Sequence, residues 1–154
     1  MYIEMTNFQS LNKRHNDTQH RSQLLLLRYN LNRWECFTIY ENSYPICCRR
    51  KGFPKGKIKT NENKLQALFR EVKEEIGIIM NTKHLHTLYY INVNAHKTTY
   101  STFISVHNID ENDIILGDEV ISYEWVSIDE VNEKNNFNLP AILAIKKLKK
   151  IYNL

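Results

Sequence analysis

The sequence is poor in the residues that shape loops and cross-link chains. Its 154 residues include only four glycines and three prolines, which excludes a collagen-like repeat or a disordered Pro/Gly-rich chain. The three cysteines are an odd number, and no His/Cys spacing resembles a zinc site, so a disulfide-built or zinc-built scaffold is excluded. We expect Cys36, Cys47 and Cys48 to be free, strand-borne thiols.

Long hydrophobic runs are also missing. The longest strongly apolar run, Leu24 to Leu27, is far shorter than the roughly 20 residues that a membrane span requires. The N-terminus is polar and carries no signal-peptide pattern. We therefore expect no membrane contact and a reducing, cytoplasmic-type location, which would be the host cytoplasm if the source were a virus.

Composition predicts a single globular domain. With 42% hydrophobic and 25% charged residues, the chain can bury one substantial core. We expect a flexible lead-in at residues 1–20 and one domain at 21–154. The net charge of +4 is compatible with a polyanionic substrate, but it is weaker than a dedicated nucleic-acid binder usually shows.

Hydrophobic patterning predicts alternating strands and helices. We expect strands at 23–29, 34–40, 45–50 and 122–126, and a hairpin of 85–93 with 98–106. A helix is expected to begin near Glu62, capped by Thr60 or Asn61, and to end at Gly77. A second helix is expected at 140–152. The pattern is that of an α/β protein.

The helix expected after Glu62 carries a dense group of carboxylates. Glu71, Glu74 and Glu75 fall within five residues and crowd together on the helix surface, beside an apolar stripe. Such carboxylates repel one another unless a cation lies between them. Hard divalent ions such as Mg²⁺ suit this oxygen-rich arrangement, especially with phosphate oxygens completing the shell.

The spacing around these carboxylates matches a known signature. Gly56, five residues, Glu62, seven residues and then Arg-Glu-aliphatic-any-Glu-Glu-any-Gly-aliphatic from Arg70 to Ile78 resembles the Nudix hydrolases at every fixed position. A merely solvated charged helix would not need this spacing. The resemblance implies a mixed β-sheet sandwiched between α-helices, covering residues 23–152. It also implies hydrolysis of a P–O–P bond in a nucleoside-diphosphate-linked substrate, with Mg²⁺ or Mn²⁺ as cofactor.

The resemblance assigns roles to individual residues. It implies that Glu71, Glu74 and Glu75 hold the metal, joined by the carbonyl of Gly56. Glu62 and Arg70 are assigned to a supporting ion pair that fixes the loop on the helix and orients Glu71. The number of ions and the preferred metal stay open.

A general base must also accept the proton of the attacking water. Glu119 is our first candidate, since it ends a loop beside a strand and resembles the base or extra metal ligand of decapping members. Asp118 and Glu75 are the alternatives. Glu124 alternates with Trp125 along the strand and is expected to face solvent.

The residues just before the signature bear on the substrate. Phe53-Pro54-Lys55-Gly56-Lys57 resembles the loop of messenger-RNA decapping enzymes, and Lys55 and Lys57 would place two ammonium groups near phosphates. This favours the mRNA cap as substrate. The alternatives are a small molecule, either a dinucleoside polyphosphate or a diphosphoinositol polyphosphate, and a non-catalytic Nudix-like binding protein.

Two further features could contact RNA or a nucleotide. Four lysines of the last helix could hold an RNA backbone, although a solvated helix face explains them equally well; they are Lys146, Lys147, Lys149 and Lys150. Aromatic residues that could stack on a nucleobase are Trp34, Tyr89, Tyr90 and Tyr100. The oligomeric state and the source organism stay open.

Overall fold

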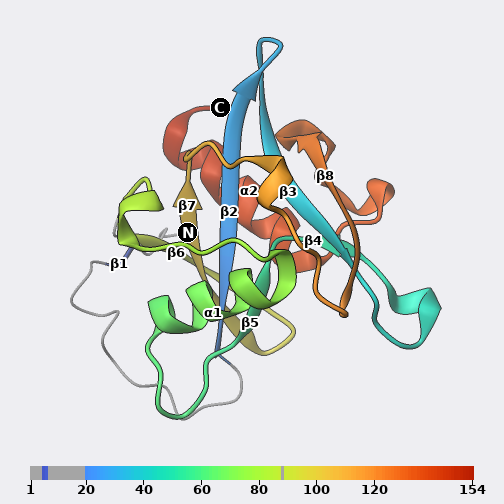
Figure 1. Ribbon diagram of the computed structural model, residues 1–154. Helices are drawn as coiled ribbons and strands as arrows, with labels where there is room; N and C mark the ends of the chain where they lie inside the picture. The colour runs from blue at the N-terminus through green and yellow to red at the C-terminus, as the bar shows by residue number, and fades with distance from the viewer. Residues whose placement is uncertain (1–4, 7–19, 88) are drawn as a thin grey trace.

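A computed structural model describes residues 5–6, 20–87 and 89–154 as a mixed β-sheet with one helix on each face (Figure 1). Its strands are β1 (Met5–Thr6), β2 (His20–Asn30), β3 (Arg33–Glu41), β4 (Lys51–Gly52), β5 (Lys55–Lys57), β6 (Tyr90–Ala95), β7 (Thr98–Ser105) and β8 (Val120–Ser127). Its α-helices are α1 (Lys64–Ile76) and α2 (Leu139–Tyr152). The expected architecture, a mixed sheet sandwiched between helices, is confirmed.

The strand order is β1-β6-β7-β2-β3-β4, with β5 also pairing with β2 and β8 with β3. β2 and β7 run parallel, whereas the other paired strands are antiparallel. β2 is therefore the strand that joins both halves of the sheet, and in Figure 1 α1 crosses in front of it and α2 behind it.

The apolar run at Leu24 to Leu27 explains how both helices attach. Leu24 and Leu26 belong to the core under α1, while Leu25 and Leu27 belong to the core under α2. Successive side chains of a strand point to opposite faces, so a strand covered on both sides needs a continuous apolar run rather than an alternating one.

Helix α1 begins two residues later than expected. Asn63, rather than Thr60 or Asn61, is the N-cap, because its side chain accepts from the backbone N–H of Gln66 and the Gln66 side chain accepts from the N–H of Asn63. This reciprocal capping box satisfies two N–H groups that a helix otherwise leaves unpaired. The helix ends as expected at Gly77, which adopts the left-handed conformation with φ 75°.

The expected strand at 45–50 is wrong. Ile46–Cys48 form a short 3-10 helix without buried residues. The pairing with β3 in this part of the chain begins after it, at Lys51–Gly52. A strand in this place would have no core to cover, so the segment turns instead, with the N–H of Cys48 donating to the carbonyl of Pro45. All three cysteines are free, but only Cys36 lies on a strand.

Other element boundaries also shift. The first strand of the expected hairpin at 85–93 is shorter and begins at Tyr90, after a 3-10 helix at Thr82–His84, whereas its partner at 98–106 matches β7. The strand expected at 122–126 is the longer β8. Of the expected flexible lead-in, Met5–Thr6 pair with β6 as β1, and the other residues before 20 lie outside the described ones.

Helix α2 starts at Leu139, with the side chain of Asn138 accepting from the N–H of Ala141. Its lysines do not all face solvent freely: Lys147 donates to the carbonyl of Asn92, and Lys149 forms an ion pair with Asp129. Neither helix in the described part of the chain is long and apolar enough to cross a membrane.

Candidate active site

A polar cleft of about 560 Å³ lies where β5, α1 and the loops at the ends of β3 and before β8 meet. Its lining contains the four residues assigned to metal binding, the first base candidate Glu119, and Lys55 and Lys57. Glu62, Asp118 and the four lysines of α2 are not among the described lining residues. The described lining residues are Arg21, Glu41, Asn42, Ser43, Lys55, Gly56, Lys57, Lys59, Arg70, Glu71, Glu74, Glu75 and Glu119. Positively and negatively charged side chains therefore concentrate in one cleft.

The first glycine of the signature makes room for its first helical carboxylate. A Cβ on Gly56 would stand 1.9 Å from the carboxyl carbon of Glu71, which is far inside contact distance. Gly56 lies on β5, opposite Ser22 of β2, so the sheet holds this contact in place. The spacing between Gly56 and Glu71 is therefore a packing requirement as well as a chemical one.

Arg70 is the hub of the ion-pair network. Its Nε and Nη2 donate to the two carboxylate oxygens of Glu62 at 3.0 and 2.6 Å, a bidentate pair. Nη2 also donates to the carbonyl of Lys57 at 2.8 Å, and Nη1 donates to Glu71 at 2.5 Å and to Glu74 at 3.3 Å. One guanidinium thus ties the loop before α1 to β5 and to two carboxylates of the helix.

The same network sets two pKa values in opposite directions. Burial opposes the ionisation of Glu62, but the hydrogen bonds from Arg70 and from the backbone N–H of Lys59 outweigh it and lower the Glu62 pKa. For Glu71, burial dominates, and the charges of Glu74 and Glu119 add to it, so its pKa is raised despite Arg70. The network thus favours the ionised form of Glu62, whereas burial and the neighbouring carboxylates disfavour the ionised form of Glu71.

Glu75 is the most deeply buried carboxylate of the cleft, with 6% of its surface exposed. Burial, followed by the nearby charge of Glu41, raises the pKa of Glu75 to about 9, although Lys55 partly opposes this. Its Oε2 accepts from the backbone N–H of Lys55 at 3.1 Å. A buried carboxylate with such a pKa is stable as an anion only when a cation approaches it.

The loop before β8 brings Glu119 to the cleft. Gly117 donates its N–H to the carbonyl of Glu75 at the end of α1, and the carbonyl of Glu119 accepts from the N–H of Asn42. Asp118 is not among the cleft-lining residues in the part of the chain that the structure describes. Glu124 is exposed as expected and pairs with Lys51 at 2.5 Å.

The donor set fits a hard divalent cation. Glu71, Glu74, Glu75 and Glu119 offer carboxylate oxygens. Burial first, and neighbouring carboxylates second, raise the pKa of Glu71 and of Glu75, and a nearby cation would offset both effects. Among the described residues, however, no three His, Cys, Asp or Glu side chains already surround a common point closely enough for metal. Arg70 holds Glu71 and Glu74, and the Lys55 N–H holds Glu75, so these three side chains would have to turn to share one cation.

Sequence reasoning missed three charged residues of the cleft. Glu41 ends β3 and pairs with the Lys55 ammonium at 3.0 Å, Arg21 lies opposite Lys57 in the β2–β5 pairing, and Lys59 lies just after β5. Glu41 and Arg21 are far from the signature in sequence and follow no fixed spacing. Only the strand pairing, which the sequence does not spell out, brings them to the cleft.

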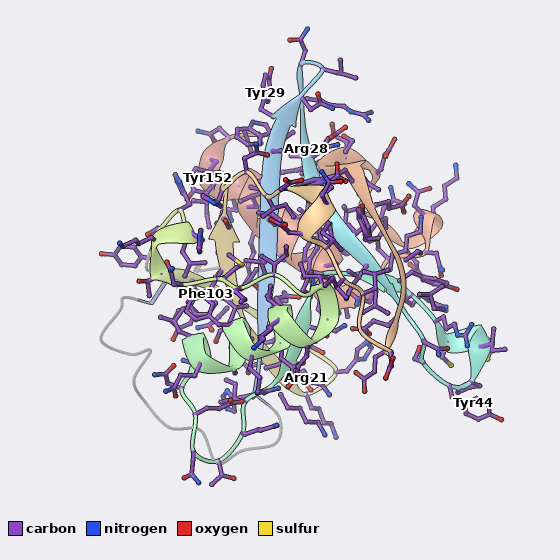
Figure 2. All side chains as sticks on the ribbon, in the orientation of Figure 1. Arg21, Arg28, Tyr29, Tyr44, Phe103 and Tyr152 are labelled. Carbon is purple, nitrogen blue, oxygen red and sulfur yellow. The ribbon has the colours of Figure 1, made fainter. Side chains whose placement is uncertain are left out.

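The four aromatic candidates for base stacking separate widely. Tyr90 is buried and accepts from Lys64, and the Trp34 ring contacts Tyr29 edge-on. Figure 2 shows Arg21, which lines the cleft, at the lower end of β2 beside α1, and Tyr29 at the upper end. Trp34 pairs with Tyr29, eight residues along β2 from Arg21. At about 3.3 Å per residue, Trp34 therefore lies roughly 25 Å from the cleft. Only Tyr100 reaches a cavity next to the cleft.

Comparison with known proteins identifies the family. The model of the NUDIX domain matches residues 16–145, which is most of the chain. The protein therefore belongs to the Nudix family, and its fold is that of a Nudix hydrolase. No curated protein sequence matched it.

Solved structures with the same fold share little sequence with this chain. An Ap4A hydrolase from C. elegans, in a binary complex, is 17% identical with a TM-score of 0.64, over 87% of this chain and 99% of that one. The MutT protein from Methanosarcina mazei Go1 is 18% identical with a TM-score of 0.64, over 88% and 95%. The NUDIX domain of Shewanella oneidensis NrtR, complexed with ADP ribose, is 12% identical with a TM-score of 0.63, over 90% of both.

Proposed function

We propose that the protein is a divalent-metal-dependent pyrophosphohydrolase of a small nucleotide, namely a dinucleoside polyphosphate. The observation that carries this proposal is the convergence of Glu71, Glu74, Glu75 and Glu119 with Lys55 in one cleft. The carboxylates would hold the cation, and the ammonium groups would bind the anionic phosphates of the substrate. A bound Mg²⁺ or Mn²⁺ would lower the pKa of a water and neutralise phosphate oxygens.

Each charged group has a distinct task in this proposal. Glu71, Glu74 and Glu75 would hold the cation, together with the Gly56 carbonyl. Arg70, itself paired with Glu62, holds the Glu71 carboxylate in place.

Glu119 is exposed in the cleft and its charge already influences Glu71, so it can accept a proton from water beside the metal-binding carboxylates. The phosphates of the substrate would be held by Lys55 and Lys57, which line the same cleft. The chain's own groups thus provide a base on one side and phosphate contacts on the other.

The similar structures support a small substrate over capped RNA. One is named an Ap4A hydrolase, and another was solved in complex with ADP ribose. Ap4A and ADP ribose are both small nucleotides. Diphosphoinositol polyphosphates belong to the same small-molecule alternative.

Capped RNA is the second candidate, and the Phe53-Pro54-Lys55-Gly56-Lys57 loop supports it. The lysines of α2, which we call the lysine helix, support RNA binding less than expected, because Lys147 and Lys149 already bind groups of the protein.

A substrate screen tests the proposal. Purified protein with Mg²⁺, and then with Mn²⁺, is offered Ap4A, inositol pyrophosphates, nucleotide sugars and capped RNA, and phosphate-containing products are separated by chromatography. Turnover of Ap4A with little release of methylated guanosine diphosphate from capped RNA is the expected result. Preferential decapping would replace the first candidate with the second, and no turnover of any compound would contradict a hydrolase.

A further inference from the structure

Two adjacent cysteines, Cys47 and Cys48, form an exposed pair of thiols in the segment between β3 and β4. Both thiols are free, and their sulfur atoms lie 3.9 Å apart, in contact through an S–H···S hydrogen bond. They belong to the short 3-10 helix Ile46–Cys48, which buries no residue. Because this helix covers no core, a reagent can reach both sulfurs from solvent.

The thiol pair lies at the edge of the catalytic cleft. Cys48 lines an adjoining cavity of about 600 Å³. Residues common to this cavity and the cleft are Glu41, Ser43 and Lys55. Arg49, the residue after Cys48, donates from its Nε to the carbonyl of Ser43 at 3.1 Å, so the segment folds back towards the cleft. A bulky group on Cys48 would therefore stand near Lys55, to which the proposed function assigns phosphate contact.

The distance between the two sulfurs indicates how they can be bridged. A direct disulfide needs sulfurs about 2.05 Å apart and favours Cα atoms roughly 4.4–6.8 Å apart. The trans peptide between Cys47 and Cys48 holds their Cα atoms only about 3.8 Å apart, so that bond would be strained. One bridging atom with sulfur bonds of about 2.3 Å and a near-tetrahedral angle holds two sulfurs about 3.8 Å apart. The observed separation of 3.9 Å matches such a bridge.

The surroundings of the pair narrow the kind of bridging atom. In the part of the chain that the structure describes, no three His, Cys, Asp or Glu side chains are grouped for metal binding, so the pair would act alone. A trivalent organoarsenical needs only two protein sulfurs, because carbon fills its third position. The hydrogen bond with Cys47, followed by the Cys47 charge, raises the pKa of Cys48, so two adjacent thiolates are disfavoured. A bridge that bonds both sulfurs removes this repulsion.

We propose that Cys47 and Cys48 are a modification site for a trivalent organoarsenical, and that a group bound there slows hydrolysis by crowding Lys55. With phenylarsine oxide, two S–H bonds and the arsenic–oxygen bond break, and two S–As bonds form. Both thiol protons leave with the oxygen as water. Arsenic stays trivalent, so the step needs neither an oxidant nor a reductant. Binding is independent of the proposed function, whereas the effect on hydrolysis rests on it.

Mass spectrometry of the intact protein tests binding without any turnover. Wild type treated with phenylarsine oxide is expected to gain one phenylarsenic group per chain, with loss of one water. Cys47→Ser and Cys48→Ser each keep one thiol and are expected to bind about 100-fold more weakly, the scale of losing one of two linked contacts. Cys36 is the internal control, since it is fully buried and burial raises its pKa, so peptide mapping should find it unmodified.

Hydrolysis of Ap4A tests the effect on the cleft. Modified wild type is expected to lose at least about tenfold in kcat/KM, as impaired substrate positioning can cause, and excess dithiothreitol should restore it by removing the arsenic. The double variant Cys47→Ser/Cys48→Ser is expected to hydrolyse Ap4A at the wild-type rate, with or without the reagent.

Three results would overturn the proposal: equal binding by the single variants, modification of Cys36 instead of the pair, or unchanged hydrolysis by the modified wild type. Specific binding of one phenylarsenic group by a protein that hydrolyses none of the compounds offered would support the modification site and contradict the proposed function. The two proposals can therefore fail separately.

Discussion

The carboxylate of Glu71 lies directly against Gly56, where any side chain would collide with it. The glycine is on a strand and the glutamate is on a helix, so this contact fixes the distance between β5 and α1 at the cleft. Gly56, the first residue of the signature, thus determines where the Glu71 carboxylate can lie.

Gly56→Ala should therefore impair catalysis by displacing Glu71. Because the Gly56 backbone is not in the left-handed region, alanine adds little backbone strain there. We expect kcat/KM to fall about 100-fold, as a displacement near 1 Å can cause. In the double variant Gly56→Ala/Glu71→Gln, the loss should not exceed that of Glu71→Gln alone, since both act through one carboxylate. Multiplied losses would contradict this coupling.

Arg70→Lys should weaken both stability and activity. Lysine keeps the charge but cannot reproduce the two-pronged pairing with Glu62, so the Glu62 carboxylate loses partners in a half-buried place. We expect about 1–3 kcal/mol less free energy of unfolding, measured by urea titration. Lys73→Ala, at an exposed position on the same helix, is the control and should change neither quantity. Wild-type stability in Arg70→Lys would contradict a stabilising role of the Arg70 ion-pair network.

The high pKa of Glu75 predicts an unusual pH dependence of stability. Its folded pKa of about 9 lies above the ordinary value of 4.5, so its contribution is complete below pH 4.5 and is lost as the pH rises towards 9. Without metal, the melting temperature should fall across this range more steeply for wild type than for Glu75→Gln. Excess Mg²⁺ should reduce the difference, because cation binding favours the ionised carboxylate. Identical slopes in both proteins would refute the assignment.

The lysine helix should be dispensable for a small substrate. The double variant Lys146→Ala/Lys150→Ala removes two exposed ammonium groups of α2. It keeps the contacts of Lys147 with Asn92 and of Lys149 with Asp129. We expect an unchanged KM for Ap4A. A KM for capped RNA that rises in this variant, with a weaker salt dependence than in wild type, would instead favour the decapping reading.

The sequence predicts the catalytic segment well because its constraints are local. Asn63, Gln66 and Gly77 cap α1 through contacts within a few residues, and the apolar stripe of the helix has a clear period. The Glu62 and Arg70 pairing also follows from their fixed spacing along one turn and helix.

The remaining parts depend on long-range pairing. The segment at 45–50 has strand-like residues but no sheet face to cover, so propensity misled the prediction. Glu41 reaches the cleft, and Tyr100 reaches the adjoining cavity, because β3, β5 and β7 all pair with β2. No spacing in the sequence encodes that arrangement.

The most direct test of the central claim is the rate of Ap4A hydrolysis by wild type and by Glu75→Gln at saturating Mg²⁺. Glutamine nearly preserves the shape of Glu75 and its contact with the Lys55 N–H, but it cannot supply the anionic oxygen that the cation requires. We predict that kcat falls at least about 100-fold in the variant, a loss typical of removing a group that stabilises the transition state. A variant that hydrolyses Ap4A at the wild-type rate would contradict the account.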